Sequence, residues 1–293
     1  MELRAPLDLG TTLRPLAHGR GDTTIRLRRS EGWLAFHTTA GPATLRLLMG
    51  GPAVVTATAW GDGAERALEG VPALVGELDR PEGFVAYHPI LRRLQRSNAG
   101  LRLPRTGRVF AALLPTVIEQ KVTGTEAFRA YAAILRRYGS PAPGPVGSLR
   151  LQPAPQRIAT LPYHAFHPLG LERKRADVIR HAATRASWLE AAADAAEATR
   201  RLVSLPGIGH WTAAEVVRVA FGDPDAVSVG DYHVPNMVAW ALAGEPRADD
   251  TRMLELLEPY RGQRGRVQRY LEVGAVVAPR YGPRMAPRRI AAI

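Results

Sequence analysis

Apolar and polar positions alternate along the N-terminal part of the chain, which is the period of a β-strand. Residues 25–28 alternate between apolar side chains and arginine, and apolar runs follow at 33–37 and 53–60, with Ser-Glu-Gly and Gly-Asp-Gly turn signals beside them. The segment 64–78 has the period of a helix that covers one face of this sheet. We therefore expect a small α+β domain over residues 1–86.

Helical spacing of apolar residues begins after this domain. The apolar side chains of 110–118 recur at i, i+3, i+4, i+7 and i+8, which predicts a buried amphipathic helix. Thr123 and Glu126 have the spacing of a capping box that begins a second helix. The proline-rich residues 140–155 predict a loop without strand or helix.

Three further helices are expected, over 172–184, 187–203 and 211–221. Ser187 and Glu190 have the spacing of a capping box at the start of the second of these. The pattern as a whole predicts an α+β, mainly α, fold. The N-terminal domain of antiparallel sheet and helix comes first. An all-α domain of two helical lobes follows over 87–285, and a C-terminal tail over 286–293 ends the chain.

Residues 205–213 read LPGIGHWTA and separate the last two predicted helices. Gly207 and Gly209 let the backbone adopt positive φ and let another backbone approach closely, because glycine has no Cβ. Free N–H groups at the start of the following helix, together with its dipole, form an anion site. The stretch therefore fits a phosphate-binding hairpin, although tight turns between packed helices show the same glycine pattern.

The composition is that of an ordinary globular protein, with 46% hydrophobic and 23% charged residues in a chain of 293. No window approaches about 18 uninterrupted apolar residues, and the N-terminus lacks the basic-then-apolar layout of a signal peptide. We therefore expect a cytoplasmic, nucleoid-associated protein without a membrane segment. Cysteine is absent, which excludes disulfides, cysteine nucleophiles, thiolate zinc sites and iron–sulfur clusters.

The formal net charge is +12, which indicates a polyanionic partner such as nucleic acid. Only two of the 39 basic residues are lysines, Lys121 and Lys174. An excess of arginine over lysine also arises in GC-rich coding genomes, so charge alone leaves nucleic-acid binding open.

A carboxylate follows the hairpin. Asp231 lies 22 residues after Gly209, in the segment DAVSVGDYHVP. LPGIGHWTA followed by this Asp-x-His resembles the helix-hairpin-helix DNA glycosylase superfamily, and within it the 3-methyladenine DNA glycosylase II (AlkA-like) branch. The segments VIEQKVTGTEA (117–127) and GLERKRADVI (170–179) resemble the same branch. The resemblance covers residues 87–275, and the N-terminal part only by its layout.

The resemblance implies a base excision repair enzyme. It would be a monomer that flips a damaged base out of duplex DNA and hydrolyses its N-glycosidic bond, with alkylated purines of the 3-methyladenine and 7-methylguanine type as substrates. Relatives that also cut the strand carry a lysine where this chain has Trp211, and that lysine forms a Schiff base with the sugar. An indole cannot, which predicts a monofunctional enzyme that uses water as nucleophile. No cofactor is expected.

Asp231 is the catalytic candidate, because a carboxylate beside the sugar stabilises the positive charge that develops when the glycosidic bond breaks. The alternative role is an N-cap, since Asp231 directly precedes a helical pattern. Trp211 is expected to line the lesion pocket, where cation–π attraction to a cationic base is worth about 0.5–2 kcal/mol, or to anchor its helix in the core. His233 matches a histidine that orders the backbone near DNA, or else packs or caps. Tyr232 is expected to pack.

The DNA-binding set implied by the resemblance comprises Gly207, Ile208, Gly209, His210, Thr212, Gln120, Lys121 and His233. The expected lesion pocket comprises Trp211, Glu215, Tyr163 and Phe166. Core packing is the alternative for the last two and for their neighbour His164. The resemblance also implies a monovalent cation that bridges to a DNA phosphate, held by the backbone carbonyls of Val203, Leu205 and Ile208.

Two positions depart from the pattern of the AlkA-like branch. The DNA-inserting residue that follows Gln120 is often apolar in that branch, whereas Lys121 either fills the gap with its methylene stem or contacts a phosphate. Glu215 stands one turn after Trp211, where some relatives have an aromatic residue. Its carboxylate could favour a cationic base, act as an acid or lie in solvent.

Two other functions remain open from the sequence. One is a glycosylase for deaminated or oxidised bases, which would share every motif and differ only in its pocket. The other is a catalytically silent DNA-lesion-binding protein built on the same hairpin. Asp223 and Asp225, in the segment GDPD, are expected to be solvated turn residues.

Overall fold

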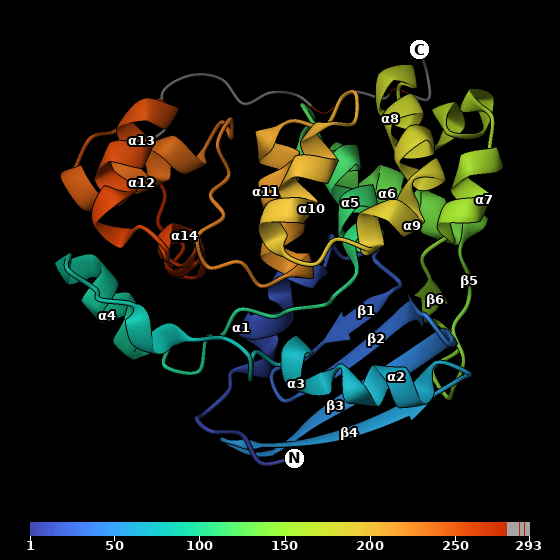
Figure 1. The fold of residues 1–293 in the computed structure, drawn as a ribbon, viewed down its shortest axis with the longest axis horizontal. Coiled ribbons are helices and arrows are strands. Elements are labelled where there is room, and N and C mark those ends of the chain that lie inside the picture. Colours follow the sequence, from blue (N-terminus) through green and yellow to red (C-terminus); the bar gives the residue numbers. More distant parts are fainter. Residues whose placement is uncertain (280–286, 288–289, 291–293) are drawn as a thin grey trace.

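The computed structural model describes residues 1–279, Pro287 and Ile290. Figure 1 shows an N-terminal sheet with helices on it, next to two groups of helices. This confirms the predicted α+β, mainly α, fold with an antiparallel N-terminal sheet. The expected tail over 286–293 lies outside the described residues except for those two positions.

The sheet has four antiparallel strands in the order β1-β2-β3-β4. The strands are β1 (Ile25–Leu27), β2 (Glu31–Thr38), β3 (Gly41–Gly51) and β4 (Val54–Trp60). One face carries Leu45, Leu47 and Val55, which are fully buried against three short helices. These helices are α1 (Leu9–Leu13), α2 (Ala64–Glu69) and α3 (Val71–Leu74).

Two features of this part differ from the sequence prediction. The helix expected over 64–78 is divided at Gly70 and ends at Leu74. Pro72 stands in the first turn of α3, and proline has no backbone N–H with which to continue the hydrogen-bond ladder of α2. Strand β3 and helix α1 have no counterpart among the predicted elements.

The middle of the chain forms one helical group around a shared hydrophobic core. Its helices are α5 (Val109–Glu119), α6 (Gly124–Tyr138), α7 (Pro155–Thr160), α8 (Arg173–Thr184), α9 (Ala186–Glu190), α10 (Ala195–Val203) and α11 (His210–Ala220), with the 3-10 turns η3 (Tyr163–Ala165) and η4 (His167–Leu169). The capping box of Thr123 and Glu126 is confirmed at the start of α6.

The second expected capping box is wrong. Ser187 lies inside α9, and α10 is capped by Asp194, whose side chain accepts the Glu197 N–H at 2.7 Å. Glu190 instead accepts the N–H groups of Val109 and Phe110, both at 2.8 Å. It therefore caps α5, a helix some 80 residues earlier in the chain, which local spacing cannot reveal.

The proline-rich segment 140–155 is not entirely a loop. Two short strands, β5 (Ser140–Pro141) and β6 (Arg150–Leu151), pair antiparallel within it, and α7 begins at its last residue. Leu149 and Leu151 pack against Ala35 on the sheet. Burial of these apolar side chains thus stabilises a strand pair that the proline content argued against.

Helix α4 and the last helices of the chain form a second group with its own core. Its helices are α4 (Pro89–Ser97), α12 (Val234–Ala243), α13 (Asp250–Leu257) and α14 (Arg264–Val273), with the 3-10 turn η5 (Glu258–Tyr260). Figure 1 shows α4 on the same side of the molecule as these C-terminal helices. No helix in the described part of the chain is both long and apolar enough to cross a bilayer.

Candidate functional site

The hairpin between α10 and α11 uses its two glycines differently. Gly207 has φ +83°, and a Cβ there would lie 2.3 Å from the Val178 side chain on α8. Gly209 has extended backbone, with φ −101° and ψ −177°, and a Cβ added there would have no atom within 4 Å. Gly207 therefore permits the turn and its packing, whereas Gly209 leaves the space before α11 open.

The first turn of α11 presents backbone donors to this open space. Gly209 is the N-cap and has no side-chain cap, and the N–H groups of a first helical turn lack intrahelical acceptors. Gly209 and His210 are exposed. Ile208 and Thr212 are only 5% and 2% exposed, so a contact of these two residues with DNA would come from their backbone groups.

A second loop lies beside the hairpin. The Gln120 side chain donates to the Gly207 carbonyl at 3.1 Å and to the Thr212 hydroxyl at 2.9 Å. The next residue, Lys121, is exposed and has φ +53°, a left-handed conformation that costs about 1–3 kcal/mol in a residue other than glycine. Buried Arg175 donates to the Ile118 carbonyl at 2.5 Å and holds the end of α5 beneath this loop. The lysine is thus presented next to the open start of α11.

Asp231 joins the hairpin helix to α12. One carboxylate oxygen accepts the Trp211 indole N–H at 3.0 Å. The other accepts the backbone N–H groups of His233 at 2.6 Å and Val234 at 2.9 Å. A carboxylate has about four lone-pair sites, so three donors fix its orientation and leave room for one further partner. The alternative N-cap role is wrong, because the N-cap of α12 is His233 and Asp231 lies two residues before it. Asp231 is half-exposed beside Trp211.

Trp211 is not a core residue. Its ring is half-buried and takes no part in the hydrophobic core that α11 shares with its neighbours. The indole instead contacts Asp231 through its N–H, and a Cβ on Gly230 would lie 3.8 Å from the Trp211 Cβ. The structure therefore places Trp211 against the turn that carries Asp231.

A buried polar network holds that turn from behind. Ser228 is fully buried, and its carbonyl accepts the Asp231 backbone N–H at 3.1 Å. Gln268, on α14, accepts the Ser228 N–H at 3.1 Å and donates to the Ser228 hydroxyl at 2.7 Å. The hydroxyl in turn donates to Glu215 on α11. Every hydrogen-bonding group of Ser228 is thereby used, which favours one conformation of the turn.

Arg218 completes this network with two carboxylates. It donates to Glu215 at 2.8 Å and to both oxygens of Glu272 at 3.0 Å. Burial raises the pKa of Glu272, but Arg218 and Arg269 outweigh burial and hold that pKa below its usual value. Glu215 is therefore an acceptor within an ion-pair network. Of the three alternatives for this residue, the one in which its carboxylate lies in solvent is wrong.

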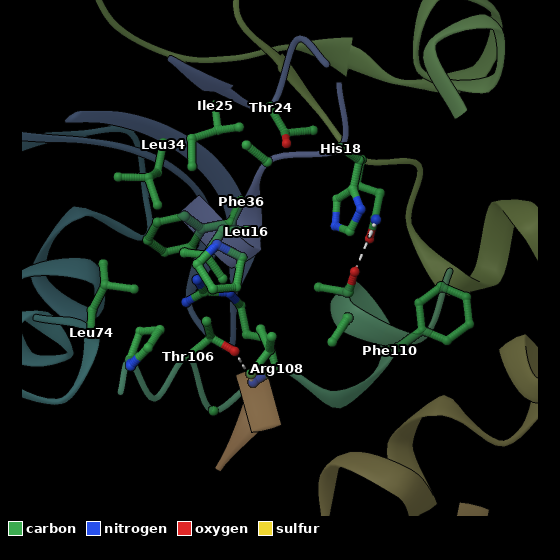
Figure 2. A pocket seen from close by; sticks show the side chains of 18 of the residues that line it. Leu16, His18, Thr24, Ile25, Leu34, Phe36, Leu74, Thr106, Arg108 and Phe110 are labelled. Atoms are coloured by element: carbon green, nitrogen blue, oxygen red, sulfur yellow. Dashed lines mark hydrogen bonds between the residues drawn. The ribbon is translucent and has the colours of Figure 1, made fainter. Parts of the chain in front are cut away.

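A cavity of about 780 Å³ begins at this network and extends between the helices and the sheet. Figure 2 shows the side chains of Leu16, Leu34, Phe36 and Arg108 that line it. The Arg108 guanidinium carbon lies 3.8 Å from the Phe36 ring centroid. Burial lowers the pKa of Arg108 to about 10, and the nearby Glu190 carboxylate opposes this shift.

Two predicted pocket aromatics lie elsewhere. Phe166 is fully buried in the core of the middle helical group, 6.4 Å from the Tyr138 ring, so the prediction that it lines a lesion pocket is wrong. Tyr163 packs at the edge of the same core, with its ring 5.9 Å from His167 and 5.5 Å from the Arg173 guanidinium. Neither residue lines the cavity beside Glu215. Their neighbour His164 lies in the same 3-10 turn as Tyr163.

Two further expectations are corrected. Tyr232 does not pack: it is 83% exposed, and only the edge of its ring meets His233, at 4.9 Å between centroids. Asp225 is not a solvated turn residue, because it pairs with Arg264 at 2.8 Å and accepts the Gly262 N–H at 2.8 Å. Burial raises the pKa of Asp225, but the Arg264 contacts outweigh burial and lower it.

The supporting residues of the site were not among the predicted ones. Arg218 and Ser228 lie about 40 residues or more before Gln268 and Glu272 in the chain. The only local signal is the i, i+4 spacing of Gln268 and Glu272, which places both on one face of a helix. Among the described residues, no group of three or more His, Cys, Asp or Glu side chains is placed to hold a metal ion.

Two curated proteins resemble the chain in sequence. A probable bifunctional transcriptional activator/DNA repair enzyme AlkA of Mycobacterium tuberculosis is 29% identical over 156 residues, which cover 52% of this chain and 32% of that protein. DNA-3-methyladenine glycosylase 2 of Escherichia coli is 28% identical over 183 residues, which cover 58% of this chain and 60% of that protein. The matches thus span less than two thirds of either relative. No protein-family model matches the chain.

Solved structures share the fold over nearly the whole chain. A 3-methyladenine DNA glycosylase from Archaeoglobus fulgidus superposes with a TM-score of 0.78 at 18% identity, covering 93% of this chain and 97% of that one. An 8-oxoguanine glycosylase/lyase from Clostridium acetobutylicum, solved with double-stranded DNA, gives 0.70 at 13% identity, covering 94% and 96%. The fold is therefore that of the helix-hairpin-helix DNA glycosylases.

Within that superfamily the chain resembles the AlkA-like branch, since both curated relatives carry AlkA-type names. The resemblance predicted from LPGIGHWTA and Asp231 is thus confirmed at the level of superfamily and branch.

The two hairpin glycines are expected to respond differently to alanine. Gly207→Ala combines a left-handed residue with a clash against Val178, and should lower the free energy of unfolding by about 2 kcal/mol or more. Gly209→Ala should change the free energy of unfolding by no more than about 1 kcal/mol. It should weaken binding to damaged and undamaged duplexes alike by about tenfold, which corresponds to the loss of one hydrogen bond to a charged group. Thermal unfolding and duplex titration test both, and equal effects of the two variants on stability would contradict the assignment.

The network behind Asp231 is expected to control the Trp211 contact. Gln268→Ala removes both hydrogen bonds to Ser228 and should loosen the turn, so that the Trp211 indole N–H exchanges faster with solvent. Proton–nitrogen NMR measures this exchange. Gln263→Ala is the matched control, because its side chain lies at the start of the same helix and contacts Arg266 instead. Unchanged Trp211 exchange in Gln268→Ala would show that the network does not hold the turn.

Proposed function

We propose that this protein is a monofunctional DNA glycosylase that excises alkylated purines from duplex DNA, as a step of base excision repair. The observation that carries the proposal is the hydrogen bond between Trp211 and Asp231, which places an aromatic face and a carboxylate side by side. The names of the curated relatives support DNA repair as the setting, and the solved complex with double-stranded DNA supports DNA as the partner.

Asp231 acts on the sugar. When the bond between C1′ and the base nitrogen breaks, the base leaves with the bonding electron pair and positive charge develops on the sugar ring. The Asp231 carboxylate stabilises that charge across a short distance. Water then forms the new bond to C1′ and releases a proton. A base that is alkylated and cationic leaves as a neutral molecule and needs no second group to protonate it.

Trp211 binds the extruded base. Its half-buried indole offers a face for stacking, and its N–H is already committed to Asp231. Attraction between the ring and a cationic base adds about 0.5–2 kcal/mol over a neutral base, which favours alkylated purines. Glu215 lies one helical turn further along α11, where its carboxylate is paired with Arg218.

The DNA backbone binds at the start of α11. The N–H groups of Gly209, His210 and their neighbours face the open space, and the helix dipole favours a phosphate there. Exposed Lys121 and His233 lie on the two flanking loops. Lys121, held in its strained conformation beside the hairpin, fills the space left by the extruded nucleotide or contacts the backbone next to it.

The backbone around the hairpin also fits the expected cation. The Leu205 carbonyl accepts the Ile208 N–H at 3.1 Å and has a second lone pair for another partner. Val203 is the last residue of α10, and the carbonyls of a last helical turn have no intrahelical donor. With Ile208, these carbonyls would hold a monovalent cation that adds positive charge beside a bound phosphate.

Asp231→Asn is expected to abolish base release. The amide keeps the size of the side chain but loses the charge, and the excision rate should fall by about 100-fold or more. Chromatography of free bases released from methylated duplex DNA measures this directly. Wild-type release of 3-methyladenine or 7-methylguanine at the same rate as the variant would reject Asp231 as the catalytic residue. Release of neither, with DNA binding retained, would favour a different lesion or a silent binder.

Covalent trapping by borohydride is expected to fail. A lyase would form a Schiff base through a lysine, and the chain has Trp211 where such relatives have that residue, with Lys121 and Lys174 at other positions. The Clostridium glycosylase/lyase fold neighbour makes this a necessary measurement. Borohydride treatment with abasic-site and lesion duplexes should give no protein–DNA adduct on a denaturing gel. A trapped adduct would overturn the monofunctional assignment.

A further inference from the structure

The cavity between the sheet and the helices lies one helical turn from the proposed base site. Trp211, Glu215 and Arg218 follow one another along one face of α11 at i, i+4 and i+7. Trp211 contacts Asp231, whereas Glu215 and Arg218 line the cavity. The helix rises about 1.5 Å per residue, so that Trp211 and the cavity wall are about 6 Å apart along its axis.

The volume of the cavity exceeds what a methylated base requires. A cavity of about 780 Å³ lies in the range of about 300–1,000 Å³ that holds drug-sized ligands. A small alkyl group such as methyl would occupy only its near end.

Apolar side chains from the N-terminal region form part of the cavity wall. Leu16 comes from the 3-10 turn η1 (Arg14–Leu16), and Leu34 and Phe36 come from β2 (Figure 2). Phe110, on α5, also lines the cavity. Leu34 and Phe36 are 4% and 7% exposed, and Leu16 is half-buried. Such walls favour a hydrocarbon or aromatic group over water.

Arg108 adds a charged group to this wall, beside the polar side chains of Thr24 and Thr106. Its guanidinium stacks on Phe36 and hydrogen-bonds to no group in the described part of the chain. It thus presents a flat, cationic surface toward the cavity, on which another aromatic ring can stack.

We propose that this cavity receives the substituent of the extruded base, and that the enzyme accordingly excises purines with aryl-sized N-linked substituents as well as methylated ones. This inference rests on the proposed function, because it requires a base bound at Trp211. It also gives the N-terminal sheet a role: together with η1 it forms the wall that sets the size limit of the substrate.

Filling the cavity tests the proposal. Leu16→Trp should reduce the release of 7-benzylguanine from duplex DNA by about tenfold or more relative to wild type, while release of 7-methylguanine changes by about twofold at most. Leu27→Trp is the matched control: Leu27 is half-buried against the same sheet core but does not line this cavity, so the ratio of the two rates should stay that of wild type. Equal loss of both substrates in Leu16→Trp would overturn the proposal.

A second measurement separates this proposal from the proposed function. Free 7-benzylguanine should bind wild type more tightly than free 7-methylguanine in calorimetric titration, and Leu16→Trp should remove the difference. If wild type excises neither base but shows this binding difference, the assignment of alkylated purines as substrates fails and the size preference of the cavity stands. If wild type excises 7-methylguanine but neither excises nor preferentially binds the benzyl base, the cavity assignment fails alone.

Discussion

The hydrogen bond between the Trp211 indole and the Asp231 carboxylate is the contact on which the site depends. It links the first turn of the hairpin helix to the turn before α12, and these segments belong to different helical groups. A hydrogen bond to a charged group is worth about 1.5–3 kcal/mol, which is enough to select one arrangement of two loops. The same bond fixes the indole ring relative to the carboxylate, which is the arrangement that the proposed function requires.

The rest of the structure supports this contact from three sides. Gln120 ties the neighbouring loop to the hairpin, and Ser228 ties the Asp231 turn to α11 and α14. Arg218 and Glu272 form an ion pair in the buried part of that network, and this pairing offsets the cost of burying their charges. The proposed site is thus rigid where chemistry requires precision, while its exposed residues, Lys121 and Tyr232, face outward on loops.

Much of this could be predicted from the sequence because it depends on local pattern. The helical stripe of 110–118, the hairpin glycines and the spacing to Asp231 are all readable within short windows. The network behind Asp231 was not predictable, since Ser228 and Gln268 meet only after folding. Phe166 shows a second limit of sequence-based prediction. An aromatic residue has the same local pattern in a core as in a pocket, and only its burial in the structure distinguishes the two. Glu190 likewise fitted a local capping box but caps a helix distant in sequence.

The central claim is that Trp211, Asp231 and the start of α11 together form one base-excision site. The most direct test is a crystal structure with duplex DNA that carries a pyrrolidine abasic analogue, whose ring nitrogen is cationic and occupies the position of the charged sugar. We expect that nitrogen within hydrogen-bonding distance of the Asp231 carboxylate, about 3 Å, and a phosphate on the N–H groups of Gly209 and His210. DNA bound on another face, or a pyrrolidine remote from Asp231, would contradict the account.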